Sequence, residues 1–401
     1  MRIAVLDSLR GLAAGSVILY HALFFIPSTQ HLLDFLRHNV YADPSLESFI
    51  ISFSPLSILL MGREWIVFFF VLSGFVLALP FYGKRPPSYL NFAVRRFCRL
   101  IIPATAIMAF SILLLLLLGT DYPPGYAKFF NMHWQEPISL PMVLRHMLLI
   151  PDPSAFEVPF SLNTPLWTLV VEWRVGLLFP LLIILARRSD WLLLTFAFAA
   201  LVLSAGEQRL FGTDHLLALR WVPCFSFGIL LAKHYKVVVE RIQAMTPATR
   251  AWLWVACILL LYIRALTPPI ETQTRQNLAN GVGVTLLMAL MLASPRLMTF
   301  LESRPLLWLG KIAFSLYLCH LPIMLAMPRI LPASISPVPQ MFIAGILSIP
   351  VAALLFRLIE EPSIEWGKRL GPAADRLAAR IGWTRATTPV GGTTTAAVSQ
   401  T

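Results

Sequence analysis

Residues 100–118 read LIIPATAIMAFSILLLLLL, a run of 19 residues without a charged side chain. The hydrocarbon core of a bilayer is about 30 Å thick, and an α-helix needs about 20 mostly apolar residues to cross it. The run therefore predicts a membrane-spanning helix. Nine further apolar runs precede or follow it, near residues 9–27, 64–82, 166–186, 191–206, 215–232, 251–266, 278–294, 307–327 and 339–359.

The composition of the whole chain agrees with this interpretation. Of its 401 residues, 57% are hydrophobic and only 13% are charged, and the mean hydropathy is +0.73. A soluble globular chain is about 45–50% apolar and about 25% charged. The composition thus excludes a soluble enzyme, a disordered protein and a collagen. We expect an all-α fold, a polytopic bundle of ten transmembrane helices.

Lysine and arginine are distributed unevenly over the segments between these runs. If the N-terminus lies inside, 21 of the 32 fall on the inner side and seven on the outer side. Because Lys and Arg accumulate on cytoplasmic loops, the pattern predicts that both ends of the chain are cytoplasmic. The same asymmetry explains the net charge of +12 without a nucleic-acid partner. The remaining four cations lie inside apolar runs: Arg10, Arg174, Arg220 and Arg264.

The chain is expected to form one membrane domain, residues 1–370, followed by a cytoplasmic tail, 371–401, that is largely disordered. The first apolar run lacks a cleavage pattern, so we expect it to remain as the first span. The long outer segments 28–63 and 119–165 are expected to form ordered caps over a cavity. The second contains His133, Trp134 and His146. Four scattered cysteines predict neither a disulfide nor a metal site: Cys98, Cys224, Cys257 and Cys319.

The first span carries two ionisable residues, and such residues inside a membrane are functional candidates by default. Arg10 and His21 are 11 residues apart, about three helical turns and about 16 Å along the axis, so they share one face. Asp7 is close enough to orient Arg10. The alternatives are an arginine that snorkels to the interface and a structural histidine. Three small residues would let other helices approach closely: Gly11, Ala14 and Gly15.

Two more interior groups need partners. Glu172 could orient His21, as the carboxylate of a catalytic triad does. Alternatively it could pair with an arginine such as Arg220 or Arg264. His320 precedes Pro322, which is expected to disturb its helix, and a structural role and a substrate contact are equally open.

Two charged motifs lie at the expected inner ends of spans. Arg96 and Arg99 precede residues 100–118 and would form one cationic patch for phosphate groups if the helix extends this far. The alternative is an ordinary positive-inside cluster. Glu360 and Glu361, before Pro362, are expected to end the last span. A carboxylate pair opposes the dipole at a helix C-terminus, so something should compensate it.

Six motifs follow one another along the chain: Leu6 to Gly11 with His21, FFFVLSGF at 68–75, Arg96 with Arg99, PLWTLVVE at 165–172, SLYLCHLP at 315–322, and Glu360-Glu361-Pro362. In these motifs and in their order, the chain resembles the acyltransferase family 3 of membrane proteins over about residues 3–370. One departure is Val171-Glu172-Trp173, where many members have Val-Glu-Glu.

The resemblance implies a multi-pass enzyme of the bacterial inner membrane. It would move an acyl group, commonly acetyl, from cytoplasmic acyl-coenzyme A to a hydroxyl group of an extracytoplasmic glycan or similar acceptor. Acyl-coenzyme A would be a substrate, and no bound cofactor is expected. The resemblance also implies that Arg10 and His21 are essential and that Arg96 and Arg99 serve the donor.

These considerations assign the site residues. The catalytic candidates are His21, Arg10 and Glu172, and the donor-binding candidates are Arg96, Arg99 and Arg10. The substrate-binding candidates are His320, Trp167 and Tyr317, and no metal ligand is expected. His21 would act as general base on the acceptor hydroxyl or take the acyl group as an acyl-imidazole. Both mechanisms require that a thioester from the inner side and an alcohol from the outer side reach its imidazole.

Two other function classes fit the same residues less well. A proton-coupled transporter of glycans or lipids also uses intramembrane His, Glu and Arg, but the sequence contains no inverted repeat. A sensor or scaffold without turnover would not need Arg10, His21, Arg96 and Arg99 together.

Overall fold

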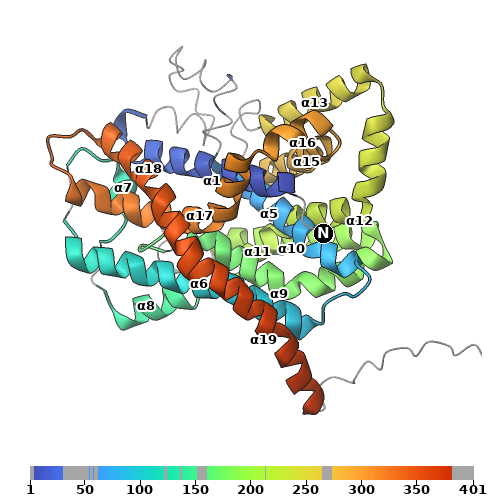
Figure 1. Cartoon of the computed structure of the whole chain (residues 1–401), viewed down its shortest axis with the longest axis horizontal. Helices are drawn as coiled ribbons and strands as arrows, with labels where there is room; N and C mark the ends of the chain where they lie inside the picture. Colours follow the sequence, from blue (N-terminus) through green and yellow to red (C-terminus); the bar gives the residue numbers. More distant parts are fainter. Residues whose placement is uncertain are drawn as a thin grey trace, which may run out of the picture.

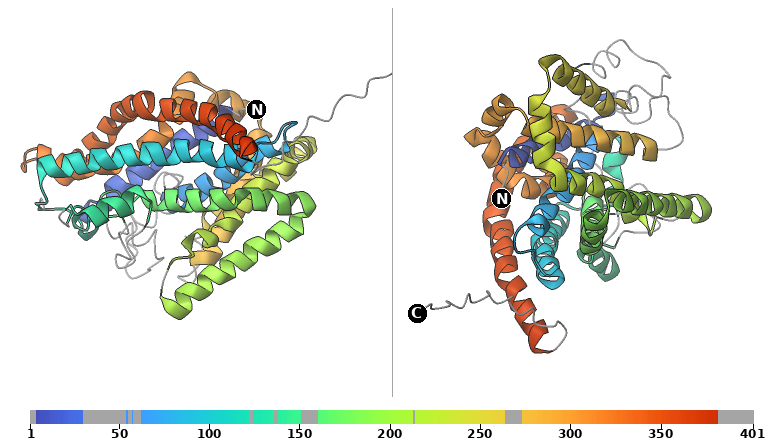
Figure 2. Two further views of the ribbon diagram at one scale, coloured as in Figure 1. Left: turned by 90° about the horizontal axis from the view of Figure 1, so that it is seen from below. Right: turned by 90° about the vertical axis from the view of Figure 1, so that its right-hand side faces the viewer.

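The computed structural model describes residues 4–29, 54, 57, 62–121, 124–135, 138–150, 160–212, 214–263 and 273–381. These residues form helices and connecting turns, and no β-strand occurs among them, as the all-α prediction requires (Figures 1 and 2). The elements are α1 (Ala4–Phe24), η1 (Pro27–Thr29), α5 (Gly62–Ala78), η2 (Leu79–Tyr82), α6 (Tyr89–Leu118), α7 (Lys128–Asn131), α8 (Leu140–Met147), α9 (Leu166–Arg188), α10 (Asp190–Phe211), α11 (Leu217–Arg220), α12 (Val222–Ala244), α13 (Pro247–Leu261), α15 (Gln273–Leu292), α16 (Pro295–Leu301), α17 (Arg304–Ile330), α18 (Pro337–Leu355), η3 (Phe356–Glu360) and α19 (Glu361–Arg380).

Each of the ten predicted spans overlaps a helix. In the described part of the chain, seven helices are long and apolar enough to cross a membrane, or eight if α15 and α16, bent by 93°, count as one span. The protein is therefore a multi-pass membrane protein. Two predicted spans fall short of this test: α13 has only 15 residues, and α1 carries Asp7, Arg10 and His21 among its 21 residues. The span count of ten and the orientation remain predictions.

Helix ends differ more from the prediction than helix positions do. α6 begins at Tyr89, well before residue 100. α12 starts at Val222 and continues to Ala244, whereas its predicted span was 215–232. The added turns are rich in charged residues, which an apolar run does not include although they continue the same helix.

Helix α17 is the centre of the bundle. Every residue from Ser315 to Pro328 is buried. Helices α1 and α18 lie against it (Figure 1). A second packed group is formed by α5, α9, α12 and α15. The cavity described below lies where these two groups meet.

Glycines set the closest helix crossings. A Cβ atom added to Gly11 would lie 2.6 Å from the backbone nitrogen of Gly310, and one added to Gly310 would lie 2.0 Å from the carbonyl oxygen of Asp7. The backbones of α1 and α17 therefore touch, as the prediction for Gly11 required. Gly15 faces open space instead. Gly74 of α5 and Gly228 of α12 form a second crossing of this kind.

Pro322 interrupts the hydrogen bonding of α17, as expected, but the helix continues past it. A proline lacks the N–H group that would bond to the carbonyl four residues earlier, which is that of Leu318. The side-chain amide of Asn163 donates to this carbonyl at 2.9 Å. Asn163 lies just before α9, so a residue of the outer segment satisfies a backbone group in the core of the bundle.

Parts of the outer segment 119–165 are ordered. Ser111 of α6 donates to the carbonyl of Leu162 at 2.7 Å, and the Tyr126 hydroxyl donates to Gln340 Oε1 at 2.8 Å. The indole of Trp134 is fully buried. The other proposed cap, residues 28–63, lies almost wholly outside the described residues.

The expected helix stop at Glu360-Glu361-Pro362 is wrong. A π-helical turn, η3, joins α18 to α19, and the helix continues to Arg380. Pro362 has no N–H group to donate to the preceding turn, and the helix widens to a π-helical turn just before it and then continues. Residues 371–380 of the predicted tail are therefore helical, and residues 382–401 lie outside the described part of the chain.

The compensation expected for the two carboxylates comes from α17. Ser315 donates to Glu360 Oε2 at 2.6 Å, and Lys311 Nζ lies 3.5 Å from Glu361 Oε1.

The helix crossing yields a test. Gly11→Ala should lower the melting temperature, because the new methyl group must separate α1 from α17, and overpacking of this kind costs about 1–3 kcal/mol. Gly15→Ala is the matched control four residues away. With open space around it, it should leave the melting temperature unchanged or raise it, since alanine favours a helix by about 1 kcal/mol over glycine. Equal effects of the two substitutions would contradict the crossing.

Candidate functional site

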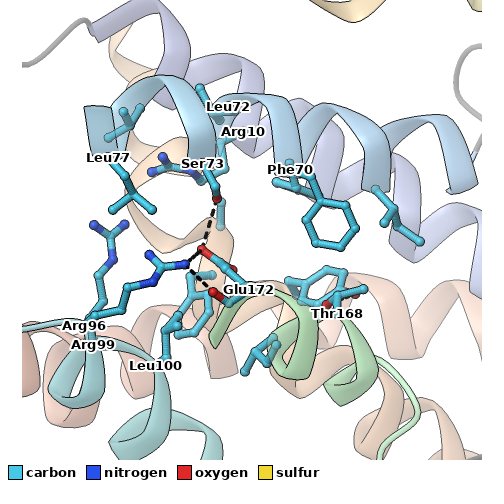
Figure 3. A pocket seen from close by; sticks show the side chains of 17 residues that line it. Arg10, Phe70, Leu72, Ser73, Leu77, Arg96, Arg99, Leu100, Thr168 and Glu172 are labelled. Carbon is cyan, nitrogen blue, oxygen red and sulfur yellow. Dashed lines mark hydrogen bonds and ion pairs between the residues drawn. The ribbon is translucent and has the colours of Figure 1, made fainter. Parts of the chain in front are cut away.

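A cavity opens between α1, α5, α6, α9 and α17, and Figure 3 shows the side chains that line it. Three arginines and one glutamate face an otherwise largely apolar lining. The lining residues are Arg10, Ile66, Phe69, Phe70, Leu72, Ser73, Val76, Leu77, Arg96, Arg99, Leu100, Thr168, Leu169, Glu172, Ala313, Phe314 and Tyr317. None of them comes from the described parts of the outer segment 119–165, so the idea that this segment covers the cavity is not confirmed.

An ion pair between α6 and α9 crosses the cavity. Arg96 Nη2 lies 3.1 Å from Glu172 Oε1 and donates to the carbonyl oxygen of the same residue at 2.9 Å. The Ser73 hydroxyl of α5 donates to Glu172 Oε1 at 3.0 Å (Figure 3). A charge in a low-dielectric interior must be paired and hydrogen-bonded, and these three contacts satisfy that requirement.

Gly176 makes room for the arginine. A Cβ atom there would lie 2.3 Å from Nε of Arg96. The Arg96 side chain is buried and held by Glu172, so it has no alternative position nearby. No local pattern in the sequence connects Gly176 with Arg96.

The partner of Glu172 decides between the two predicted roles. Glu172 pairs with an arginine and does not orient His21. That arginine is Arg96, however, and neither of the two suggested by the sequence. Arg220 instead pairs with Asp214 at 2.8 Å, and Arg264 lies outside the described residues.

The other two arginines of the cavity differ in their contacts. Arg10 Nη1 lies 3.2 Å from Asp7 Oδ1, as predicted, and its side chain points into the cavity (Figure 3). This placement disagrees with a purely snorkelling role. Arg99 forms no ion pair or hydrogen bond with the described residues. Because α6 extends back to Tyr89, Arg96 and Arg99 do lie on one helix and line one cavity.

The two candidate histidines form a pair. Nδ1 of His21 on α1 lies 2.9 Å from Nε2 of His320 on α17, and the rings stack with centroids 5.0 Å apart. His320 is fully buried. The sequence marked each histidine separately but did not predict their contact.

The cavity does not extend to this pair, since neither histidine lines it. Tyr317 provides the connection: it lines the cavity, and its ring centroid is 6.0 Å from that of His320. Its hydroxyl shares a hydrogen bond of 2.9 Å with Thr168. A thioester entering from the arginines would therefore have to pass Tyr317 to reach His21.

Trp167, the third substrate-binding candidate, lies elsewhere. Its ring packs near Phe70 and Trp221, with centroid distances of 6.4 and 5.9 Å, and it does not line the cavity. Trp173, where many family members have a second glutamate, packs edge-on against Phe97 at 6.0 Å. Of the three substrate-binding candidates, only Tyr317 contributes to the cavity.

Comparison with known protein families identifies the family of the chain. A family model described as "Acyltransferase domain", that of acyltransferase family 3, matches residues 3–357. The chain belongs to acyltransferase family 3. It is thus a membrane acyltransferase by family, and its cavity lies within the matched residues. Neither the comparison with curated proteins nor that with solved structures found a match.

A separate polar cluster links the outer segment to α9, the helix that carries Glu172. His133 is buried. Its Nδ1 donates to the carbonyl of Phe129 at 2.9 Å. Its Nε2 accepts from the Thr164 hydroxyl at 2.6 Å. These contacts fix the neutral tautomer, and burial lowers the pKa of His133 to about 4.

This pKa predicts acid sensitivity. An unfolded histidine has a pKa of about 6.5, so as the pH falls from about 6.5 to about 4 the unfolded chain takes up a proton that the folded acyltransferase does not. Stability is therefore full above pH 6.5 and falls by roughly 3 kcal/mol toward pH 4. The melting temperature of His133→Gln should depend less on pH over this range. Parallel wild-type and variant profiles would contradict the assignment.

Proposed function

We propose that this chain transfers an acyl group, in the simplest case acetyl, from cytoplasmic acyl-coenzyme A to a hydroxyl group of an extracytoplasmic glycan or similar acceptor, across a bacterial inner membrane. One observation carries the proposal: a cavity with three guanidinium groups and one carboxylate lies one helical turn from a pair of imidazoles. Family membership supports the acyl transfer itself.

The arginines suit the donor. Coenzyme A carries several phosphate charges, and guanidinium groups bind phosphate through paired, charge-assisted hydrogen bonds. Arg96 is already held by Glu172, so Arg99 and Arg10 are the better candidates for direct contact with phosphate. The predicted topology places the cavity's arginines toward the cytoplasm, where acyl-coenzyme A is available.

The imidazole pair suits the chemistry. If the Nδ1–H group of His21 donates its hydrogen bond to Nε2 of His320, then Nε2 of His21 is the basic nitrogen. His320 then has the orienting role that a carboxylate has in a triad. His21 would accept the proton of the acceptor hydroxyl while the hydroxyl oxygen attacks the thioester carbonyl. The C–S bond would then break, and the coenzyme A thiolate would leave and take the proton from His21. In the covalent alternative, a nitrogen of His21 attacks the thioester carbonyl, the C–S bond breaks and coenzyme A leaves as the thiol. The acceptor hydroxyl would then attack the acyl-imidazole and lose its proton as the acyl–nitrogen bond breaks, which restores neutral His21.

The experiment that tests the function uses the purified protein in lipid nanodiscs with acetyl-coenzyme A and extracted envelope glycans. We expect release of free coenzyme A that depends on the glycan, together with an acetyl increment on the glycan in mass spectrometry. A transporter would consume no acyl-coenzyme A, so absence of thioester loss under all acceptor conditions would overturn the proposal. Envelope glycans from cells with and without the gene would identify the acceptor.

Substitution of the central residues gives the next prediction. His21→Ala and Arg10→Ala should each abolish transfer, with a loss of at least about 100-fold, the lower end of what acid–base catalysis contributes. Both variants should still fold and insert, as judged by membrane yield and melting temperature. Arg174→Ala is the control, because Arg174 contacts the carbonyl of His215 and does not line the cavity. Wild-type turnover by a folded His21→Ala protein would refute the role of His21.

The donor site is tested by two arginines one turn apart on α6. Arg99→Gln should raise KM for acetyl-coenzyme A about 10- to 100-fold, the worth of a hydrogen bond to a charged group, with a smaller change in kcat. Arg95→Gln should leave KM unchanged, because Arg95 is exposed and lies outside the cavity lining. If both substitutions raise KM equally, the effect is general surface charge and not a donor site in the cavity.

A further inference from the structure

The last helix of the described chain is too long to lie wholly within a bilayer. From Pro337 through Arg380 it runs for 44 residues, about 66 Å at 1.5 Å per residue, whereas a bilayer with its headgroups measures about 40–45 Å. Figures 1 and 2 show α19 (red) continuing past the end of the bundle. α18 has no charged residue, but α19 has seven. The helix therefore changes from a membrane span to a polar segment near the η3 turn.

One face of α19 is occupied by α6. Its buried residues include Gly367 and Gly371. A Cβ atom at Gly367 would lie 3.2 Å from Cα of Arg95, and one at Gly371 would lie 2.6 Å from Oδ1 of Asn91. This contact is too close to leave room for other side chains, so it fixes which faces of α19 remain open.

A stripe of large apolar side chains lies on an open face. It consists of four residues that are 51–69% exposed: Trp366, Leu370, Leu377 and Ile381. At 100° per residue their spacings of four, 11 and 15 residues place them within an arc of about 60°. A soluble helix would not leave such a stripe uncovered.

The charges of α19 divide into two groups. The acidic residues have protein partners: Glu361 contacts Lys311, Glu365 pairs with Lys368, and Asp375 accepts from Ser88 and Asn91. Three exposed arginines form no ion pair with the described residues: Arg369, Arg376 and Arg380. Each immediately precedes a residue of the apolar stripe. The stripe is thus bordered along one side by exposed cations that form no ion pair with the described residues, although Arg369 lies near enough to Glu365 to interact with its charge.

We propose that α19 lies in the surface of the bilayer, with the apolar stripe at the boundary between acyl chains and headgroups and the three arginines bound to anionic phospholipid headgroups. A narrow apolar face beside a basic edge is the pattern of interfacial helices, and tryptophan favours the headgroup level. Charge complementarity selects an anionic leaflet. Continuity with α18, a candidate membrane span, places the start of α19 at the membrane boundary near the η3 turn.

The placement of α19 also bears on the cavity. The turn of α6 that contacts Gly367 and Gly371 directly precedes Arg96 and Arg99. A lipid surface that holds α19 therefore fixes the start of the helix that supplies two of the three cavity arginines. The proposal itself does not depend on the acyltransferase activity, and its test does not measure that activity.

Depth measurements on the full-length protein test the proposal. Spin labels are attached to Leu377→Cys, in the stripe, and to Ala379→Cys, an exposed control on another face. The four native cysteines are buried, and unsubstituted protein measures their background labelling. In nanodiscs that contain phosphatidylglycerol, the label at 377 should collide with oxygen several-fold more than with an aqueous nickel chelate, and the label at 379 should show the reverse.

Two results would overturn the placement. One is equal accessibility of both labels to the nickel chelate, which indicates a helix in water. The other is protection of the label at 377 from both oxygen and nickel, which indicates a protein partner or a second copy over the stripe.

The role of the arginines is tested by lipid preference. Native mass spectrometry of wild type should show retained phosphatidylglycerol in preference to phosphatidylcholine, and each Arg→Gln change at 369, 376 or 380 should lower that preference about fivefold. Arg241→Gln, an exposed position on α12, should leave it unchanged. Equal retention of the two lipids by wild type and by the triple Gln variant would overturn the headgroup contacts.

Discussion

Helices α1 and α17 touch backbone to backbone where Gly11 meets Gly310, and the arrangement of the site depends on this contact. α1 contributes Arg10 and His21, and α17 contributes Tyr317 and His320. Side chains as short as imidazole can form a direct hydrogen bond between two helices only if the helix axes are close. Glycine has no side chain, so at the crossing it lets the two helix backbones approach this closely.

The second requirement of the site is electrostatic. A guanidinium group in an apolar bundle requires a nearby opposite charge. The carboxylate of Glu172 supplies it for Arg96, and the carbonyl of Glu172 accepts a hydrogen bond from the same Nη2 atom. The Nε atom of Arg96 has no hydrogen-bond partner among the described residues, and Gly176 leaves the space that it occupies. The cavity therefore combines one locked arginine with two that retain donors toward its interior, Arg10 and Arg99. Such a division lets one part of the site remain rigid while another part binds a charged ligand.

Sequence patterns predicted the features that depend on residues close together in the chain. Apolar runs marked the positions of all ten helices that were expected, because burial in lipid requires an uninterrupted apolar surface. Helix ends were missed where charged turns continue the helix. Pairing of Glu172 with an arginine was one of the two predicted roles, but the arginine that pairs with it, Arg96, lies in such a turn of α6 and was not among the suggested partners. The contact between His21 and His320 spans 299 residues, and no periodicity within either helix encodes it. The family motifs marked both residues but not their partnership.

The amide of Asn163 and the carbonyl of Leu318 are separated by 155 residues, and this has a consequence for how the protein is made. When the segment before α9 has been synthesised, its partner in α17 has not yet been made. The gap that Pro322 leaves in the helix ladder is closed only after α17 has inserted and the earlier segment has docked onto it. Final assembly of this end of the bundle is thus a late event in biogenesis, and it joins the beginning of one helix to the middle of another over 155 residues of sequence.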